Sequence, residues 1–415
     1  MGTKTRIGYA CTPISIPYKT SRGFMLKNFN ENNFEECVRC NIEDLMSILR
    51  WNVKRGIYMF RISSDIIPFA SHSINNIQWW NIFKKELSEC GKFIRDNGVR
   101  VSMHPGQYTV LNSSSEDVVQ KSIKELEYHC KFLDSLEIDY TNKIVLHVGG
   151  VYGDKISAMK RFKDNFYKLS NSMQKRLVIE NDDKSYTIED ILSICSDIKI
   201  PAVFDNLHHK LNPCNIQLNE IIDRVKSTWK TEDGPVKFHY SDQDNEKKGG
   251  AHSKYVVTDN FLKLMDNIKN INADVMLEVK DKEISALKCV YSLKEDLEVS
   301  LRTEQWAKYK YSVMEKNYSH YKKCSSLVNS EVPMSHVYTY IDDCLSLPFN
   351  EGSFINTVQH VYGYLKDKTT PNEKQKFNDL LSNANGNKDR IKEMLQKLCK
   401  KYEVDYINNS YYFVY

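Results

Sequence analysis

Eight short apolar runs alternate with amphipathic stretches over the first 280 residues of the chain. Each run is nearly continuous in apolar character, which is typical of strands that are buried on both faces. The runs lie at 6–10, 57–64, 99–104, 143–150, 176–181, 201–206, 235–241 and 274–279. Eight such strand–helix units predict an α/β fold, a closed (β/α)₈ TIM barrel. A doubly wound open sheet is the alternative, but its ligand-binding residues would cluster at one crevice.

The strand rhythm stops after about residue 290, and the rest of the chain has helical periodicity. Breaks are expected at Thr370-Pro371 and Asn385-Gly386, where turn-forming dipeptides interrupt the pattern. We therefore expect a TIM-barrel domain over 1–295 and a smaller, all-helical domain over 300–415. The stretches that predict its helices are 292–329, 353–367, 370–384 and 387–402.

Composition sets outer limits on what this chain does. The formal net charge of the 415 residues is only +4, so the total charge does not indicate an anionic partner. We find no run of about 18 apolar residues and no signal peptide, and we expect a cytoplasmic protein without a membrane span. The 11 cysteines are scattered and are expected to be reduced thiols. Cys37 and Cys40 have the spacing of a redox or zinc pair, but they lie in a helical stretch without a second pair.

Histidines and carboxylates recur where the apolar runs end. In a TIM barrel the carboxyl ends of the strands meet at one mouth, which is where barrels keep their active sites. Imidazole and carboxylate groups suit zinc, manganese or iron ions. The residues expected to converge there are His104, His147, Glu180, Asp205, His208, His239, His252 and Glu278. So many at one structural position predict a multinuclear metal centre.

Two features of this set indicate neighbouring ions. Asp205 and His208 are about one helical turn apart and can serve two metals, and Glu180 is suited to bridge them. Two ions about 4 Å apart can clamp the attacking and leaving oxygens of a phosphodiester. We expect His129, in mid-helix, and His209, on the opposite face from His208, to have no ligand role.

At these residues the chain resembles the UV damage endonuclease family, a (β/α)₈ relative of endonuclease IV. The matching stretches run in order over roughly residues 6–283. They are IGY, FRISSDIIPFASH, SMHPGQYTVLNS, LHVGG, IENDD, VFDNLHH, KFHYSDQ, GAHSKYV and LEVKDKE. The helical tail resembles a domain of unknown function, which implies no mechanism.

The resemblance implies two or three divalent ions, manganese first, with zinc, cobalt or magnesium as alternatives. His104 and His147 would join Glu180 at one ion, and His208 and His252 would hold a third. The second ion would be held by Glu180, Asp205, His239 and Glu278. Lys237 would be carboxylated and supply a further oxygen, and the resemblance makes Glu180, Lys237 and His239 the catalytic residues. His72 would line the site. Related nucleases carry an Asp where this chain has Gly250.

The resemblance also implies residues that read the lesion. Gln107 and Tyr108 would wedge into the duplex, because an aromatic plug can replace the stacking lost when damaged nucleotides leave the helix. Tyr9 would lie on the lesion side. Pro13 stands where typical members carry an Asn, so we expect the lesion pocket to differ in shape.

The function implied is hydrolysis of the phosphodiester 5′ to UV photoproducts in damaged double-stranded DNA, with abasic sites as a second candidate lesion. The sequence identifies no protein partner. A metal-dependent sugar isomerase or epimerase on the same barrel is one alternative; it would not need Gln107 and Tyr108. A DNA-damage binding protein without catalysis is the other, and the full ligand set argues against it.

Overall fold

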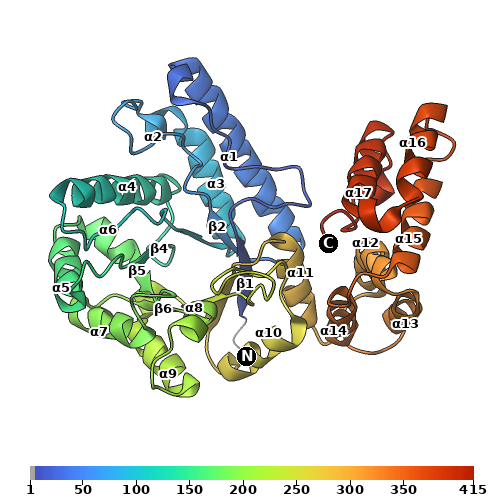
Figure 1. Ribbon diagram of the computed structural model, residues 1–415. Helices are drawn as coiled ribbons and strands as arrows, with labels where there is room; N and C mark the ends of the chain where they lie inside the picture. Colours follow the sequence, from blue (N-terminus) through green and yellow to red (C-terminus); the bar gives the residue numbers. More distant parts are fainter. Residues whose placement is uncertain (1–4) are drawn as a thin grey trace. The chain divides into compact units, whose positions relative to one another are not determined.

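The computed structural model describes residues 5–415 and contains a closed barrel of eight parallel strands in sequence order, β1 next to β2 and β8 next to β1 (Figure 1). The predicted (β/α)₈ barrel is therefore confirmed, and each strand lies within about two residues of a predicted run. The strands are β1 (Arg6–Ala10), β2 (Met59–Ile62), β3 (Arg100–Met103), β4 (Lys143–His147), β5 (Leu177–Glu180), β6 (Ala202–Asp205), β7 (Val236–Tyr240) and β8 (Ala273–Leu277).

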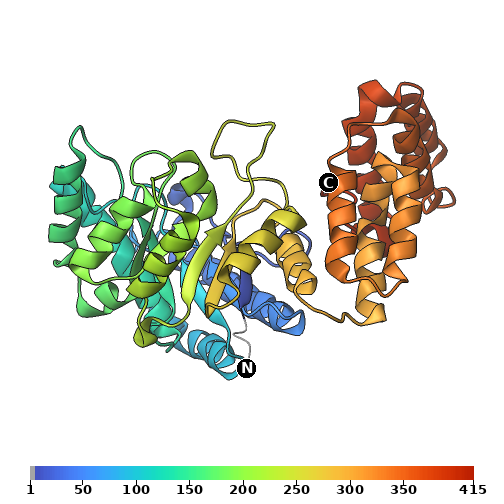
Figure 2. The same cartoon turned by 90° about the horizontal axis from the view of Figure 1, so that it is seen from below.

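Helices surround these strands (Figure 1). The main ones are α1 (Glu31–Lys54), α3 (Lys84–Asp96), α4 (Glu116–Ser135), α5 (Lys155–Phe166), α7 (Ile188–Ile198), α9 (Leu218–Thr228), α10 (Thr258–Ile268) and α11 (Glu283–Ser292). Shorter helices are α2 (Trp79–Ile82), α6 (Asn171–Arg176) and α8 (Asn206–Leu211). Thr187 caps α7 through a capping box, whereas Ser115 occupies the N-cap of α4 without a side-chain bond. The long loop between β7 and α10, in yellow-green, extends beyond the strands (Figure 2).

The interior of the barrel holds charged side chains as well as apolar ones. Arg100 and Asp274 form an ion pair of 2.7 Å with both side chains almost fully buried. Lys143 is buried too and pairs with Asp233 at 2.6 Å. Lys237, on β7 and in register with Asp274, is fully buried. Buried charges are costly unless they are paired, so the pairing of each one bears on its role.

The chain divides into two compact units. The first is the chain up to Val256 together with Asn260–Leu287; the second is Val257–Asp259 together with Lys288–Tyr415. After α11 the second unit is entirely helical in the part of the chain that the structure describes. Its helices are α12 (Val299–Lys316), α13 (Tyr318–Val328), α14 (Met334–Leu345), α15 (Glu351–Gly363), α16 (Pro371–Leu381), α17 (Ala384–Lys401) and α18 (Asp405–Asn408).

Three details of this helical region differ from the prediction. The long helix expected over 292–329 is broken at Asn317, whose extended backbone ends α12 and whose side chain caps α13. The break expected at Asn385-Gly386 is wrong, because Asn383 caps α17 and the dipeptide lies in its first turn. The helices α14 and α18 were not predicted. The start of α16 after Thr370 is confirmed by a capping box.

Among the described residues, no helix is both long and apolar enough to span a bilayer. The 11 cysteines are free thiols. Cys37 donates to the carbonyl oxygen of Arg22 at 3.1 Å, which gives this half of the Cys37–Cys40 pair a structural role.

Candidate metal centre

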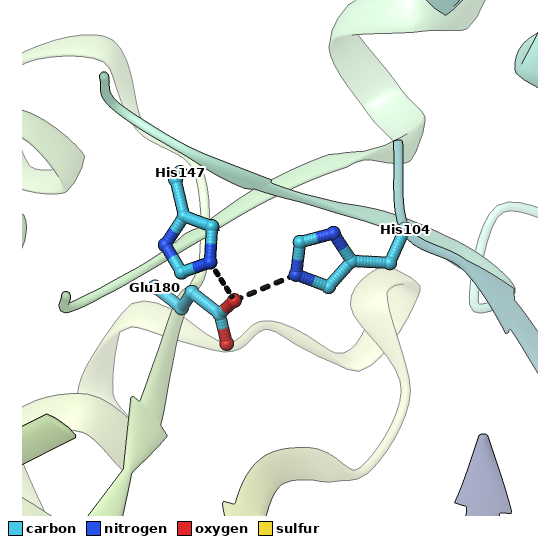
Figure 3. A group of neighbouring side chains, drawn as sticks. All are labelled: His104, His147 and Glu180. Carbon is cyan, nitrogen blue, oxygen red and sulfur yellow. Dashed lines mark hydrogen bonds and ion pairs between the residues drawn. The ribbon is translucent and has the colours of Figure 1, made fainter. Parts of the chain in front are cut away.

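Glu180 lies at the centre of the barrel mouth, almost fully buried, with three imidazoles around its carboxylate. Its Oε1 lies 2.7 Å from His104 Nε2 and 2.9 Å from His147 Nε2. Figure 3 shows the two rings pointing at this one oxygen from different strands. Its Oε2 faces Nδ1 of His239. One carboxylate therefore joins three imidazoles, two at Oε1 and one at Oε2.

Strand register produces this convergence. His147, the last residue of β4, pairs with Glu180, the last residue of β5. Asp205, the last residue of β6, pairs with His239 on β7 in the same way. His104 directly follows β3. Because parallel strands in a barrel end at one mouth, His147, His239 and His104, which are 33, 59 and 76 positions from Glu180 in the sequence, all come within bonding distance of its carboxylate.

These residues form two groups that can each hold an ion. The ligand atoms of His104, His147 and Glu180 lie within 4.8 Å of one another, and so do those of Glu180, Asp205 and His239. Both groups contain Glu180, which is the position expected of a bridging ligand. Imidazole nitrogen and carboxylate oxygen together suit divalent ions such as zinc and manganese.

Glu278 extends the second group. It follows β8, and its Oε1 lies 3.2 Å from Nδ1 of His239. Its Oε2 lies 3.9 Å from Nε2 of His252, so Glu278 connects the central groups to the outer histidines.

His208 and His252 form the outer part of the site. Their ring centroids are 6.4 Å apart, and the centroid of His208 is 5.6 Å from that of His147. The backbone N–H of His208 donates to Oδ1 of Asp205 at 2.7 Å, and its Nδ1 lies 2.9 Å from the carbonyl oxygen of Asn181. This contact fixes the ring so that Nε2 is the nitrogen available for a ligand. The structure thus brings all eight predicted ligands into one cluster.

The electrostatics of the cluster follow from the shared carboxylate. Burial alone would raise the pKa of Glu180, but His239, His147 and His104 lower it well below its usual range. Burial lowers the pKa of His147, yet Glu180 outweighs that effect and raises it to about 9. For His104 burial dominates and the pKa is lowered. Since two imidazolium ions cannot share one carboxylate oxygen cheaply, we assign the proton on the imidazole pair at Oε1 to His147. Burial lowers the pKa of His208, but Asp205 and Glu180 outweigh that effect and raise it.

Several buried polar atoms of the cluster have no hydrogen-bond partner. Unsatisfied buried polar atoms are rare in folded proteins and call for an explanation such as a bound ion. Among the cluster's described residues these atoms are Asp205 Oδ2, His147 Nδ1 and His252 Nδ1. Glu180 Oε2 and His239 Nδ1 also lack a hydrogen bond, although they face each other as an ion pair. The oxygen of Asp205 and that of Glu180 are the donors that a divalent cation accepts, so the residues present fit a metal centre.

Sequence reasoning missed two residues of the cluster. Arg61 on β2 is buried, forms an ion pair with Glu278, and has a guanidinium nitrogen 3.3 Å from Nε2 of His239. The sequence feature that could have indicated Arg61 is its position as a charged residue inside the apolar run 57–64. Asn181 exchanges two hydrogen bonds with the backbone of Asp205, at 2.9 and 3.0 Å. These contacts hold β5 and β6 in the register that positions their carboxylates.

In the described part of the chain, two other predicted site residues form no hydrogen bond or ion pair with the cluster. Lys237 is fully buried, and its Nζ has no hydrogen-bond partner among the described residues. Burial lowers its pKa well below the usual range; Arg100 lowers it further, and Asp274 opposes this. His72 is exposed in the loop after β2 and accepts a bond from the backbone of Ile74. No contact of the described residues joins His72 to the cluster.

The two histidines expected to have no ligand role are also accounted for. His129 is buried in α4, with Nδ1 2.7 Å from the carbonyl oxygen of Glu125 and Nε2 2.9 Å from the Ser64 hydroxyl. That hydroxyl donates to the carbonyl oxygen of His104 at 2.7 Å, so His129 supports the cluster indirectly. The His209 ring lies against Phe204.

The residues expected to touch DNA divide into two kinds. Tyr108 is 84% exposed, and Gln107 beside it is exposed. Tyr9 is fully buried, and its hydroxyl donates to Asn52 of α1 at 3.0 Å. Its side chain packs in the core between β1 and α1, so the expected DNA contact is not available to Tyr9 in this structure. Ile14 and Ser15, which follow Pro13, donate hydrogen bonds from their backbone N–H groups to the carboxylate of Glu283.

We compared the chain with models of known protein families. The model of the family described as UV-endonuclease UvdE matches residues 5–310. The chain belongs to the UV-endonuclease family. Residues 310–415 match a second family, described as a protein of unknown function, DUF1722. The predicted resemblance of both parts is confirmed.

Individual relatives agree with the family match. A protein of Clostridium perfringens named UV DNA damage endonuclease is 45% identical over 412 residues, which cover 98% of this chain and 99% of the relative. One from Bacillus cereus with the same name is 33% identical and covers 71% of this chain and 95% of its own length. The crystal structure of SacUVDE superposes with a TM-score of 0.68 at 42% identity, covering 70% of this chain and 99% of that one. Family members thus occur with and without the helical region.

Proposed function

We propose that this protein is a UV DNA damage endonuclease that hydrolyses the phosphodiester 5′ to UV photoproducts in double-stranded DNA. Abasic sites are a second substrate under this proposal. The observation that carries it is the buried carboxylate of Glu180, shared among the imidazoles of His104, His147 and His239, in a chain of the UV-endonuclease family.

Two or three divalent ions, with manganese first, fit the donor set. His104, His147 and Glu180 would hold one; Glu180, Asp205, His239 and Glu278 the second; His208 and His252 the third. When bound, such ions supply hydroxide at neutral pH and neutralise charge on the phosphate. The chain itself holds Glu180 deprotonated, which its lowered pKa supports. Arg61 orients Glu278 and keeps that carboxylate ionised, since the guanidinium lowers its pKa against the effect of burial.

Lys237 is proposed to be carboxylated on Nζ. The reaction with carbon dioxide needs a neutral amine, and burial lowers the pKa of Lys237 in that direction. A carbamate would place a negative charge among Arg100, Arg61 and Lys143, whose positive charges act on this site. Gly250 stands where relatives of the endonuclease IV type carry an Asp, and its φ of +88° is in the region that favours glycine.

Gln107 and Tyr108 are proposed to probe the duplex. Both side chains are exposed on the loop that begins with His104, so a wedge at this point would reach the DNA beside the proposed ions. The outward position of Tyr108 supports a role in stacking, because an aromatic ring that is 84% exposed contributes little to a core.

The test is nicking of supercoiled plasmid, irradiated or not, by protein loaded with manganese. We expect nicks only in irradiated plasmid, with the break 5′ to the photoproduct when end-labelled fragments are mapped. Chelation should stop the reaction, and manganese should restore it. Tight binding to irradiated plasmid without nicking at full metal occupancy would favour the non-catalytic alternative. Turnover of keto sugars without nicking would favour the epimerase.

A further inference from the structure

A hollow of about 560 Å³ lies between the loop after β3 and the loop after β4. Gln107 and Tyr108 form one wall, and Tyr152 from the β4 loop forms another. Val110, Val118 and Lys121 complete the lining, together with two glycines. The volume is in the range of small-molecule sites. None of the eight clustered ligands lines it, so the hollow is separate from the place where a phosphodiester would be cut.

The backbone of the β4 loop is shaped to present Tyr152. Tyr152 has a φ of +52°, a left-handed conformation that is an outlier for a bulky side chain. Gly149 has a φ of +112°, and a Cβ there would lie 2.4 Å from Oδ1 of Asn112. The loop therefore approaches its neighbour closely, and Tyr152 remains 47% exposed. Strain of this kind is kept where a site requires it.

Hydrogen bonds hold this loop in place. The carbonyl oxygen of Gly150 accepts from Asn112 at 2.7 Å and from the Tyr186 hydroxyl at 3.1 Å. Arg161 donates to the carbonyl oxygen of Asn112 at 2.9 Å, and its guanidinium lies 5.5 Å from the centre of the Tyr152 ring. The ring is thus supported on one side by a cation and by the loop backbone before any ligand binds.

We propose that Tyr152 stacks on an unpaired nucleobase that leaves the damaged duplex when Gln107 and Tyr108 enter it. This inference rests on the proposed function. The hollow offers two exposed aromatic rings, two valines and one lysine, which match a flat aromatic base joined to a phosphate. The base comes either from the strand opposite the lesion or from a position flanking the lesion.

The test compares Tyr152→Ala with Tyr152→Phe, which keeps the ring. Tyr152→Gly also removes the ring, but glycine adopts the positive φ without strain. A loss shared by Tyr152→Ala and Tyr152→Gly is therefore not caused by misfolding of the loop. Tyr167→Ala is the matched control, because Tyr167 is 62% exposed but lies at the C-terminal end of α5, away from the strand carboxyl ends. Affinity for a photoproduct duplex and its undamaged counterpart is measured by fluorescence anisotropy without divalent ions.

We expect Tyr152→Ala and Tyr152→Gly to bind the damaged duplex about 5- to 150-fold more weakly, the effect of one stacked base. Tyr152→Phe and Tyr167→Ala should bind as the unmodified protein does. If the stacked base comes from the opposite strand, abasic analogues opposite the lesion should abolish the difference in affinity between Tyr152→Ala and the unmodified protein. If it comes from a flanking position, abasic analogues at the flanking positions should abolish that difference. A difference that survives both replacements, or equal losses in the Phe and Ala variants, would overturn the proposal.

Failure of this inference is distinguishable from failure of the proposed function. If the unmodified protein nicks irradiated DNA and Tyr152→Ala binds and nicks equally well, the function stands and the stacking site is wrong. If no nicking occurs but binding depends on the Tyr152 ring and on the extruded base, the stacking site stands and the endonuclease proposal is wrong.

Discussion

Arg302 in the helical unit and Lys237 in the barrel are both buried cationic side chains, but their surroundings differ. Arg302 donates to four carbonyl oxygens, of Val328, Val332, Leu327 and Ser330, at 2.7 to 3.0 Å. Lys237 has no hydrogen-bond partner among the described residues. A buried cation is stable only when it is paired, modified or neutral.

The same contrast holds for a buried aspartate in each of the two units. In the second unit, Asp342 accepts from Lys288 at 2.6 Å and from the Thr258 hydroxyl at 2.6 Å. In the barrel, Asp205 is equally buried but leaves Oδ2 without a partner. Within the described residues, the groups able to hold a metal lie in the barrel alone. Arg302 and Asp342 in the helical unit thus have partners within the protein, whereas Lys237 Nζ and Asp205 Oδ2 in the barrel have no hydrogen-bond partner among the described residues.

The largest effect is expected from Glu180→Gln. Removing the shared charge should lower nicking of irradiated plasmid by a factor on the order of a thousand or more, the equivalent of several kcal/mol. Duplex affinity should change little because the proposed DNA-probing residues Gln107 and Tyr108 are unaltered. Glu189→Gln, an exposed glutamate at the start of α7, is the control. Near-normal turnover of Glu180→Gln would show that this carboxylate is not the bridge.

Lys237→Met should lower nicking by about 10- to 100-fold, the usual cost of losing a supporting group of a metal site. The melting temperature should not fall, because methionine fills the site without a buried amine. Carbon-13 NMR with labelled bicarbonate should show a carbamate signal in the unmodified protein and none in Lys237→Met. A bare amine at full metal occupancy, seen in a high-resolution map, would refute carboxylation.

Metal affinity should depend on pH through His147. The metal-free site holds a proton there, because Glu180 raises the pKa to about 9 against the effect of burial. An ion held by His104, His147 and Glu180 displaces that proton, so affinity for this ion should rise roughly tenfold per pH unit below about 9 and then level off. The raised pKa also stabilises the metal-free fold fully below about pH 6.5, and this contribution is lost as pH rises through about 9.

Calorimetry of metal binding and melting curves of the metal-free protein, both across this pH range, check the two statements. His147→Gln is the control, since it removes the titrating group. A binding constant independent of pH between 6.5 and 9 would place the proton elsewhere.

The smallest effect on activity is expected from Arg302→Met, which tests the other half of the comparison. The variant leaves four carbonyl oxygens without their donor and should reduce stability by about 3 kcal/mol or more. Nicking at a temperature where the protein is folded should change by no more than about twofold, as for distant, independent sites. A large loss of nicking in folded, metal-loaded Arg302→Met would connect the helical unit to the DNA site.

Much of this arrangement could be predicted from sequence. Strands buried on both faces give continuous apolar runs, and their carboxyl ends carry the eight clustered ligands. Arg61 was missed because one charge within an apolar run gives no direction for its side chain. Tyr9 was misplaced because a strand residue can face either the barrel axis or a covering helix, and only packing against Asn52 decides between them. The helix break at Asn317 was not predicted because the Glu and Lys pairs of this stretch favour a continuous helix. The break depends on the Asn317 side chain, which caps α13.

Elemental analysis of metal-replete protein tests the central claim most directly. The account predicts two or three divalent ions per chain, because the donors around Glu180 form two overlapping groups with the outer pair His208 and His252 beside them. Glu180→Gln should lose at least one of these ions, and Arg302→Met should lose none. One ion or fewer per chain in the unmodified protein would contradict a multinuclear centre.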